Sequence, residues 1–331
     1  MSTYKESGVD IDKANLALSK VKKHIRSTFN ENTLSDVGSF GGCYRFPSTK
    51  FKDPILVSSA DGVGTKLKVA FLADKHDTIG QCLVNHCVND ILAVGARPLF
   101  FLDYYAAGIL EPSTFEQVVS GISLACKENN CVLIGGETAE MPGFYKEGDY
   151  DLSGTIVGVA DGDNILGKRE TKPGDLLIGL KSTGLHTNGY SLAREVLLKR
   201  YNINDNIDIL KTSLADSLLA VHRSYLPIVG PILDNQGLHA ISHVTGGGII
   251  ENTDRVICDK QILNVDWKNW EAPDIFNLIQ EVGSVPISDM RRTFNMGIGL
   301  ILVIDSNASE SIFSHLDSIN ESYVVIGSVG I

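Results

Sequence analysis

The sequence predicts a protein of two α/β domains, and three observations lead to that expectation. The chain has 331 residues, enough for two domains with substantial hydrophobic cores. Short apolar runs of strand length alternate with longer segments of helical spacing. Between residues 161 and 174 the composition shifts to polar residues, Gly and Pro, which is typical of a domain boundary. We therefore expect one domain over residues 1–168 and a second over residues 169–331.

The first half is expected to form four strands with helices between them. Apolar residues recur at helical spacing from residue 11 to residue 29, which predicts a helix there. Asp77 is placed to cap a later helix, and Ser113 with Glu116 has the spacing of a capping box for the next one. The other expected elements are strands over residues 55–60, 99–105, 131–134 and 152–160, and helices over residues 78–94 and 113–127.

The second half opens another alternation of strands and helices. A strand is expected to lead into a polar loop over residues 182–190, and that loop into a helix. A later strand ends in Thr245-Gly246-Gly247-Gly248. The expected elements of this half are strands over residues 175–181, 238–244 and 298–304 and a helix over residues 273–281.

Composition and charge exclude several classes of function. Hydrophobic residues make up 43% and charged residues 21%, as in ordinary globular proteins. The chain has 29 basic and 40 acidic residues, a formal net charge of −11. Nucleic acids and anionic membranes attract basic surfaces, so neither is an expected partner. A phosphate site in this chain must be built locally from glycine amides, a few basic side chains and metal ions.

The sequence also predicts a cytoplasmic location. The first twenty residues have no apolar segment of the kind that a signal peptide contains, and no apolar run is long enough to span a bilayer. Six cysteines are present without a C-x-x-C pair, so we expect reduced thiols.

The segment DGVGTK, residues 61–66, carries the strongest chemical signature. Asp61 follows the expected strand, and an ionised carboxylate suits Mg²⁺. Glycines let the backbone approach a phosphate, and Lys66 adds positive charge. The other phosphate-binding candidates in the segment are Gly62, Gly64 and Thr65. The spacing matches neither a P-loop nor a dinucleotide fingerprint. An ATP–Mg²⁺ site is therefore one interpretation, and a tight turn with a solvent-facing lysine is the other.

Four acids lie in or at the ends of apolar elements. Asp61, Asp90, Glu137 and Glu140 share this placement, and burying a carboxylate without a partner costs several kcal/mol. Several such acids without matching buried cations favour Mg²⁺, which prefers oxygen ligands. For Asp90, a salt bridge to Arg97 or a helix cap is the alternative. Asp103 lies inside an expected strand and is a candidate for nucleotide or metal binding, or for a backbone hydrogen bond.

Two polar loops are candidates for substrate binding. The loop over residues 182–190 contains His186 and Asn188 before an expected helix, whose first amides can bind an anion. His186 suits a general acid or base, although a structural hydrogen bond is equally open. The glycines of residues 245–248 suit a second phosphate. Asn295 either reaches a ligand amide or simply leads into a strand.

Taken together, these segments resemble the phosphoribosylformylglycinamidine cyclo-ligases, also called aminoimidazole ribonucleotide synthetases, of purine biosynthesis. The resemblance covers nearly the whole chain, and DGVGTK with GGETAEMPG, residues 135–143, is its most specific part. It implies a two-domain PurM-like α/β (α+β) fold, with an amino-terminal four-stranded sheet and a carboxy-terminal α/β domain. It further implies a homodimer in which the two amino-terminal sheets pair into a barrel, with ATP in a groove near the interface.

The resemblance also implies a reaction and a set of site residues. ATP would phosphorylate the formyl amide oxygen of formylglycinamidine ribonucleotide, and the substrate's amidine nitrogen would close the ring. The implied Mg²⁺ ligands are Asp61, Asp90 and Glu137; the implied nucleotide-binding residues are Gly41, Gly42, Gly62, Gly64, Thr65, Lys66 and Asp103. The implied substrate-binding residues are Ser182, Thr183, His186, Asn188, Thr245, Gly246, Gly247, Gly248 and Asn295, and the catalytic ones are Asp61, Lys66 and His186.

One departure and two alternatives accompany the resemblance. The loop Gly41-Gly42-Cys43-Tyr44 differs from the family's usual glycine, phenylalanine, glycine, so its nucleotide role is the least supported. A selenophosphate synthetase or a thiamine-monophosphate kinase would use the same ATP–Mg²⁺ site on another acceptor. A non-catalytic nucleotide-binding paralogue is the remaining alternative, but such a protein would have no need for unpaired buried acids.

Overall fold

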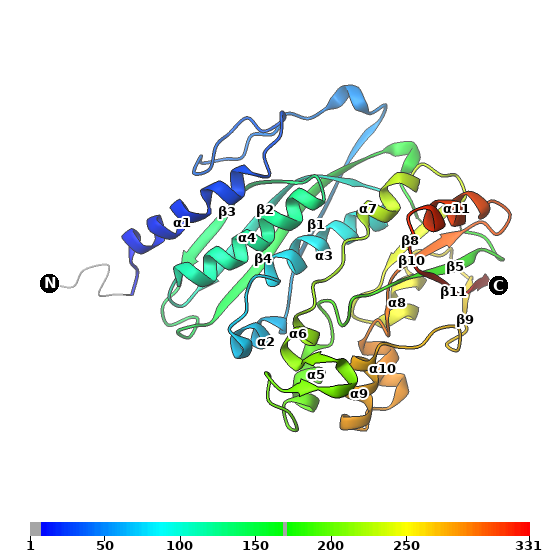
Figure 1. Cartoon of the computed structure of the whole chain (residues 1–331). Coiled ribbons are helices and arrows are strands. Elements are labelled where there is room, and N and C mark those ends of the chain that lie inside the picture. Colours follow the sequence, from blue (N-terminus) through cyan, green and yellow to red (C-terminus); the bar gives the residue numbers. More distant parts are fainter. Residues whose placement is uncertain (1–7, 168–170) are drawn as a thin grey trace.

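The computed structural model describes residues 8–167 and 171–331. They form two α/β units, each built on its own sheet (Figure 1). The boundary predicted between residues 168 and 169 falls outside the described residues, so its position stays a prediction. Among the helices of the described chain, none has both the length and the apolar character that crossing a membrane requires.

The first sheet has four strands, as the sequence predicts, and their order is β1-β4-β2-β3. Their bounds are Pro54–Gly62 for β1, Arg97–Ala107 for β2, Val132–Glu140 for β3 and Tyr150–Asp161 for β4. The β1–β4 and β4–β2 pairs are antiparallel, whereas β2 and β3 are parallel and joined by a crossover helix. Each strand is longer than its apolar run, so Asp61 lies within β1 and Glu137 within β3.

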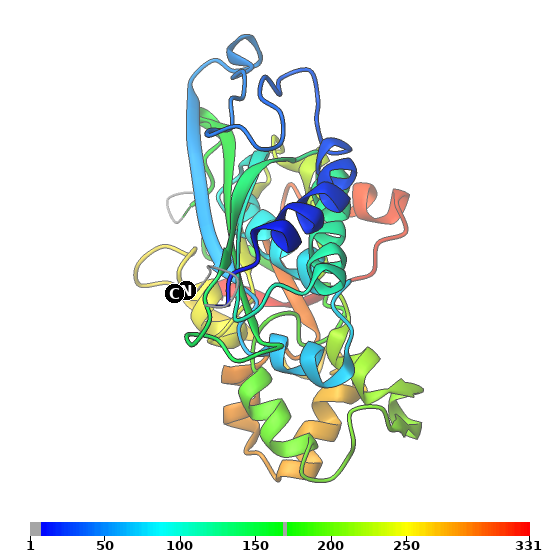
Figure 2. The ribbon, with the colours of Figure 1, turned by 90° about the vertical axis from the view of Figure 1, so that its left-hand side faces the viewer.

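Helices cover one face of this sheet and leave the other open (Figures 1 and 2). The covering helices are α1 (Ile11–Arg26), α3 (Ile79–Ala93) and α4 (Pro112–Glu128); the short α2 (Lys66–Ala73) follows β1. On the open face, Leu56 is 64% exposed and Tyr104 39% exposed. A bare sheet face with exposed apolar residues is typical of a surface that another protein chain covers.

Two predicted helix caps are wrong. The α4 helix has Pro112 in its first turn after Glu111, whose side chain makes no capping hydrogen bond. Proline is favoured at this position because its fixed φ suits a helix and its missing N–H costs no hydrogen bond. The Ser113–Glu116 capping box therefore does not form. The α3 helix is preceded by Thr78, not Asp77, at the N-cap position, again without a side-chain cap.

The second sheet has five antiparallel strands in the order β8-β10-β5-β11-β9. Every residue of β8 and β10 is buried; β10 is apolar throughout, whereas β8 buries His239, Ser242 and His243. The strands are β5 (Leu176–Lys181), β8 (Leu238–His243), β9 (Ile262–Val265), β10 (Ile298–Ile304) and β11 (Tyr323–Gly330), with a small β6–β7 hairpin (Asn206–Ile207, Thr212–Ser213) outside the sheet. The helices are α5 (Tyr190–Leu197), α6 (Leu214–Leu219), α7 (Leu226–Val229), α8 (Gly248–Asp254), α9 (Asp274–Gly283), α10 (Ile287–Thr293) and α11 (Glu310–Ser318).

The α3 helix joins the two units. One side packs on β1, β2, β4 and α4 of its own unit, and another side packs on β8 and α7 of the second unit. Leu92 near its end belongs to the hydrophobic cluster that includes Ile178 and Tyr225. The helix is therefore buried almost all round, as its apolar sequence predicts.

Two glycines allow α3 and α4 to lie in close contact. A Cβ added at Gly80 would lie 2.1 Å from the Val118 carbonyl oxygen, and one added at Gly121 would lie 2.5 Å from the Asp77 carbonyl oxygen. Any side chain at these positions would push the helices apart.

We predict that Gly80→Ala lowers the free energy of unfolding by about 1–3 kcal/mol, the usual cost of overpacking a core. Helix propensity alone would change stability in the opposite direction, by about 1 kcal/mol in favour of Ala. Urea unfolding followed by circular dichroism measures the difference. Ser19→Ala on the exposed face of α1 is the matched control and should be neutral or slightly stabilising. A Gly80→Ala protein as stable as the original would contradict the close helix contact.

Candidate functional site

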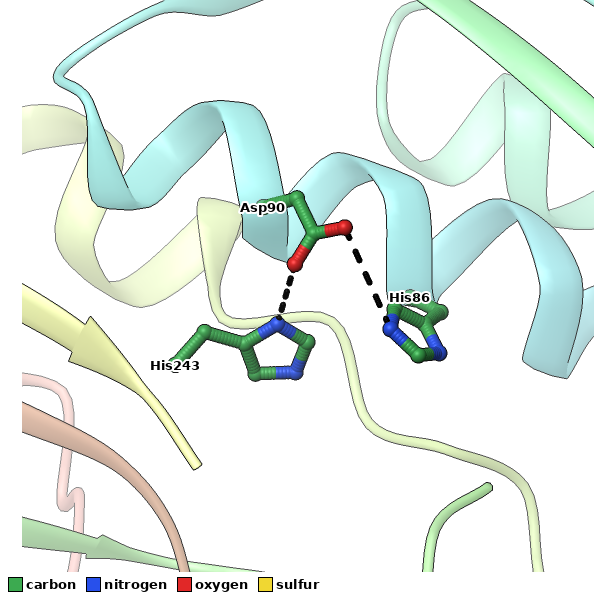
Figure 3. Close-up of side chains that lie close together, drawn as sticks. All are labelled: His86, Asp90 and His243. Atoms are coloured by element: carbon green, nitrogen blue, oxygen red, sulfur yellow. Dashed lines mark hydrogen bonds and ion pairs between the residues drawn. The ribbon is translucent and has the colours of Figure 1, made fainter. Parts of the chain in front are cut away.

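Asp61 of β1 and Asp90 of α3 converge on one histidine. The Nε2 atom of His86 lies 3.0 Å from Asp61 Oδ2 and 3.9 Å from Asp90 Oδ2. The other oxygen of Asp90 lies 2.8 Å from His243 Nδ1 at the end of β8 (Figure 3). Ser59 donates a hydrogen bond to Asp90 Oδ2 at 2.9 Å. Two of the three predicted metal ligands therefore lie together, where the two units meet.

The alternative of an Asp90–Arg97 salt bridge is not observed. The Arg97 guanidinium donates to the Gly230 carbonyl oxygen and lies 3.8 Å from Asp234. Both site acids remain accessible to solvent, with side chains 41% exposed for Asp61 and 26% exposed for Asp90. The carboxylates are thus balanced by imidazoles and not by a guanidinium.

The histidines hold both carboxylates in the ionised form. Burial alone would raise the pKa of Asp61, but the hydrogen bond and charge of His86 outweigh burial and lower it. The pKa of Asp90 is lowered in the same way, because His243 outweighs burial. Burial also lowers the pKa of His243, whereas for His86 the two acids outweigh burial and raise it. The site is a compact group of paired acids and imidazoles.

Glu137 does not join this group within one chain. Asp61 pairs with Gly154 of β4, and β2 lies between β4 and β3, so Glu137 stands at the far edge of the sheet. Successive residues of a strand point to opposite faces, and Glu137 is in register with Tyr104 on the open face. Within one chain, Glu137 therefore lies apart from Asp61 and Asp90, and its role as a metal ligand stays a prediction.

Lys66 is buried and does not face an open phosphate site. Its ammonium donates to the carbonyl oxygens of His186, at 3.0 Å, and Ala220, at 2.7 Å, and it lies 3.1 Å from Cys82 Sγ. Burial would lower the pKa of Lys66, but its contacts with Cys82 and Tyr190 outweigh burial and raise it. This charged group ties α2 to two loops of the second unit. The solvent-facing alternative for this lysine is wrong as well.

The rest of the DGVGTK turn lies against the loop over residues 182–190. Gly62 donates its N–H to Asp61 Oδ1 at 2.8 Å, which orients that carboxylate. The hydroxyls of Thr65 and Ser191 lie 3.1 Å apart. Gly64 has a positive φ of 54° and faces the backbone of Thr187, so a side chain there would be strained. The predicted nucleotide turn and the predicted substrate loop are therefore neighbours.

His186 lies below the surface of the site. It is 1% exposed, its ring stacks on His222 at 4.0 Å between centroids, and Thr183 donates its N–H to His186 Nε2. Its Nδ1 atom is buried without a hydrogen-bond partner among the described residues. Burial, together with nearby charges such as that of Lys66, lowers the pKa of His186 well below its usual range. The surroundings therefore favour the neutral ring, and a catalytic role for His186 stays a prediction.

Ser182 and Asn295 bond to the protein itself. The Asn295 amide donates to the Gly184 carbonyl oxygen and accepts from the Ser182 hydroxyl and the Gly297 N–H. The Thr183 hydroxyl donates to the Val221 carbonyl oxygen. The expectation of a free Asn295 amide is therefore wrong, because its polar atoms are used to fix the loop.

Asn188 and the glycines of residues 245–248 lie side by side. A Cβ added at Gly246 would lie 3.3 Å from Asn188 Oδ1. The buried Asn252 donates to three carbonyl oxygens of this glycine segment and fixes its shape. Gly247 and Gly248 both have positive φ, and a Cβ on Gly248 would lie 1.9 Å from the Arg291 carbonyl oxygen. These two predicted substrate segments form one continuous surface.

Asp103, Gly41 and Gly42 lie elsewhere. Asp103 points to the helix-covered face, over Gly136 of β3, where burial raises its pKa to about 7. Asp103 is two strands away from Asp61. Gly42 packs against Ile134 at the β3 edge. Within one chain, none of the three reaches the acid–histidine group.

Three histidines of the site were not predicted from the sequence, namely His86, His222 and His243. For His86, the signal that could have found it is its spacing from Asp90, since residues four apart share a helix face.

The chain is similar over nearly its whole length to known proteins. The AIR synthase related protein family matches with its N-terminal domain over residues 43–160 and its C-terminal domain over residues 172–330. The phosphoribosylformylglycinamidine cyclo-ligase of Pseudothermotoga lettingae is 45% identical, over 99% of this chain and 96% of its own length. That of Geotalea daltonii is 46% identical, over 99% and 94%. The thiamine-monophosphate kinase of Stenotrophomonas maltophilia has a similar fold, with a TM-score of 0.69 at 18% identity over 94% of this chain and 93% of its own.

We predict that Lys66→Met destabilises the fold, because the Ala220 carbonyl oxygen loses its lysine donor and the His186 carbonyl oxygen keeps the Tyr190 hydroxyl but loses the ammonium. A buried acceptor left without a partner costs about 1–3 kcal/mol. Urea unfolding measures the loss, and Lys68→Met, two residues along the same helix, is the matched control. Lys68 is 45% exposed, so that change should stay within about 0.5 kcal/mol of the original protein. Equal stabilities of the two variants would show that the Lys66 contacts are weak.

Proposed function

Because this chain belongs to the AIR synthase related family, we propose that it is a cyclo-ligase of purine biosynthesis, like its curated relatives. The reaction is the ATP-dependent closure of formylglycinamidine ribonucleotide to 5-aminoimidazole ribonucleotide. The observation that carries this proposal is identity of 45–46% with cyclo-ligases over 99% of the chain. The thiamine-monophosphate kinase alternative shares only the fold, at 18% identity.

The chemistry requires positioning more than a reactive side chain. The formyl amide oxygen takes the terminal phosphoryl group of ATP, and ADP leaves. The substrate's own amidine nitrogen then attacks the activated carbon, and phosphate leaves with the former amide oxygen. Because nucleophile and electrophile belong to one molecule, the enzyme mainly has to orient them and balance charge. A site of paired acids, imidazoles and glycine loops fits that requirement.

Asp61 and Asp90 fit a Mg²⁺ ion that accompanies ATP. Both carboxylates are ionised, partly open to solvent, and directed at the same point near His86. Hard oxygen ligands of this kind suit Mg²⁺, which usually keeps several waters and phosphate oxygens besides one or two carboxylates. When bound, the ion neutralises triphosphate charge. The chain's contribution is to hold both acids ionised and in place, which His86, His243, Ser59 and the Gly62 N–H achieve.

The substrate is expected to lie on the surface shared by Asn188 and residues 245–248, next to the turn of Gly62, Gly64 and Thr65. Lys66 and Asn295 support these loops from below and, in this proposal, position them without contacting the ligand. His186 likewise supports the loop, because its buried ring is not open to exchange a proton with a substrate. A role for Thr183 and for the backbone amides of residues 246–248 in holding phosphate stays a prediction.

A homodimer would complete the site. The open sheet face carries Glu137 together with exposed Leu56 and Tyr104, so pairing two such faces would bury apolar surface. Glu137 of one chain would then stand in the interface, where it can reach the ATP site of the other chain. The loop with Gly41 and Gly42, at the same edge of the sheet, could also act across the interface. Cytoplasmic location stays a prediction.

The activity itself is the first test. Purified protein with ATP, Mg²⁺ and formylglycinamidine ribonucleotide should form the aminoimidazole product and release ADP only when the substrate is present. Asp61→Asn should lower kcat/KM by about 10²–10³-fold, the usual effect of losing one electrostatic contact in a site. Asp317→Asn, an exposed acid on α11, is the matched control and should keep its activity. Absence of both product and substrate-dependent ADP would sink the assignment.

The proposed role of Glu137 across the dimer predicts complementation between inactive variants. Asp61→Asn and Glu137→Gln homodimers should each be inactive. A hybrid dimer, purified by a different tag on each chain, should regain about half of the original turnover, because one of its two sites is intact. If Glu137 acted within its own chain, the hybrid would be as inactive as its parents. A fully active Glu137→Gln homodimer would exclude a metal-binding role.

A further inference from the structure

His86, Asp90 and His243 form a group with the donor set of a transition-metal site. One ligand atom from each lies within 4.8 Å of the others, and within residues 8–167 and 171–331 no other group of this kind occurs. His86 and Asp90 are one turn apart on α3, and His243 comes from the second unit at the end of β8 (Figure 3). Both histidines are buried, at 5% and 7% exposure, so the ring positions are fixed by packing.

The outer contacts of the two rings are those that metal-binding histidines have. A histidine that binds a metal through one nitrogen donates its other ring N–H to a fixed partner. His86 Nε2 lies 3.0 Å from Asp61 and 3.9 Å from Asp90, and its Nδ1 lies 2.7 Å from the Thr187 hydroxyl. His243 faces Asp90 through Nδ1, and its Nε2 lies 3.2 Å from His222 Nε2. Both rings therefore present one nitrogen to the site carboxylates and have a partner for the other.

The proton positions can be followed from Asn89. Its Oδ1 accepts from the Tyr225 N–H and its Nδ2 donates to the Arg223 carbonyl oxygen, which fixes the orientation of the amide. The same Nδ2 lies 3.2 Å from His222 Nε2, so that nitrogen must accept. His243 Nε2 lies 3.2 Å from the same His222 nitrogen, so a hydrogen on His243 Nε2 faces an acceptor when Nδ1 binds a metal.

In the metal-free chain, Nδ1 of His243 lies 2.8 Å from Asp90 Oδ1 and donates its hydrogen to that carboxylate. A metal ion bound by these two atoms would take the place of this hydrogen. The ring hydrogen would then lie on Nε2, which faces His222. The surroundings of His243 therefore suit both the metal-free and the metal-bound ring.

We propose that His86, Asp90 and His243 form a binding site for a divalent transition-metal ion of the zinc type. Two imidazoles with one carboxylate suit Zn²⁺ and Co²⁺, and three protein ligands leave a position for water beside Asp61, which lies 3.0 Å from His86 Nε2. Mg²⁺ prefers oxygen ligands and would not use the two imidazoles. The ion joins α3 to β8, and hence one unit to the other.

The proposed metal site does not depend on the proposed function, but its competition with Mg²⁺ does. Since Asp90 is also the proposed Mg²⁺ ligand, an ion held by the two histidines competes with Mg²⁺ for this carboxylate. The binding experiment therefore uses metal-free protein without nucleotide, so that its outcome is separate from that of the activity test.

Calorimetric titration of the metal-free chain with Zn²⁺ should show one ion bound per chain, and Zn²⁺ should raise the melting temperature. Two isosteric variants test the ligands. The amide of Gln reaches the position of Nε2, so His86→Gln is used; the amide of Asn reaches that of Nδ1, so His243→Asn is used. Each should weaken Zn²⁺ binding by at least about 100-fold, and Thr187→Val, which removes an outer contact, by about 10-fold. His24→Gln on α1 is the control and should bind as the original does.

Co²⁺ gives a signature that a merely structural histidine pair would not show. Paramagnetically shifted, exchangeable proton signals are expected from the His86 Nδ1–H and the His243 Nε2–H, and each histidine variant should lose one. These signals decide the question even if a variant is poorly folded, since they are observed on the original protein. No saturable Zn²⁺ binding, or equal binding by the original chain and both folded variants, would overturn the proposal.

Discussion

The structure depends on the burial of α3 between two sheets. A helix without a solvent-facing side must find a partner for each polar side chain, because an unpaired buried polar group costs about 1–3 kcal/mol. Asn85 donates to the His222 carbonyl oxygen, and Asn89 bonds to the backbone of Arg223 and Tyr225. The second unit thus supplies the partners that the first lacks. The same contacts hold the segment before α7 in place, and with it His222, whose ring contacts His243.

Most of the fold followed from local pattern. The strand at Ile298–Ile304 and the start of the helix at Ile11 were predicted to the residue, because a buried strand and an amphipathic helix have distinct periodicities. The predicted third strand ended at residue 134, whereas β3 continues to Glu140. The second half of β3 is polar and glycine-rich, and it pairs only because β2 lies beside it. Strands β9 and β11 and the short helices of the second unit were not predicted. Their sequences are only partly buried, so tertiary contacts and not propensity decide their structure.

Part of the site was predictable from the sequence, and burial explains which residues were predicted correctly and which were not. Asp61 and Asp90 could be grouped because acids in apolar elements need a common cation, a physical requirement visible in the sequence. Lys66 and Asn295 were given ligand contacts because their motifs are polar, yet the second unit covers both. The direction in which Glu137 points depends on strand register, because successive residues of a strand face opposite sides of the sheet. The irregularity between Phe101 and Leu102 in the β2–β3 pairing cannot be read from the sequence.

The acid–histidine group is best understood as a set of carboxylates whose counterions can be exchanged. In this structure imidazoles keep Asp61 and Asp90 ionised, so the acids are preorganised before a cation arrives. An arginine in their place would form a bidentate pair that a cation could not displace easily. A histidine can release its proton at neutral pH and stay as a neutral ring or become a ligand itself. The choice of imidazole therefore lets the same two carboxylates serve a proton, Mg²⁺ or a softer ion, with the two units held together in each case.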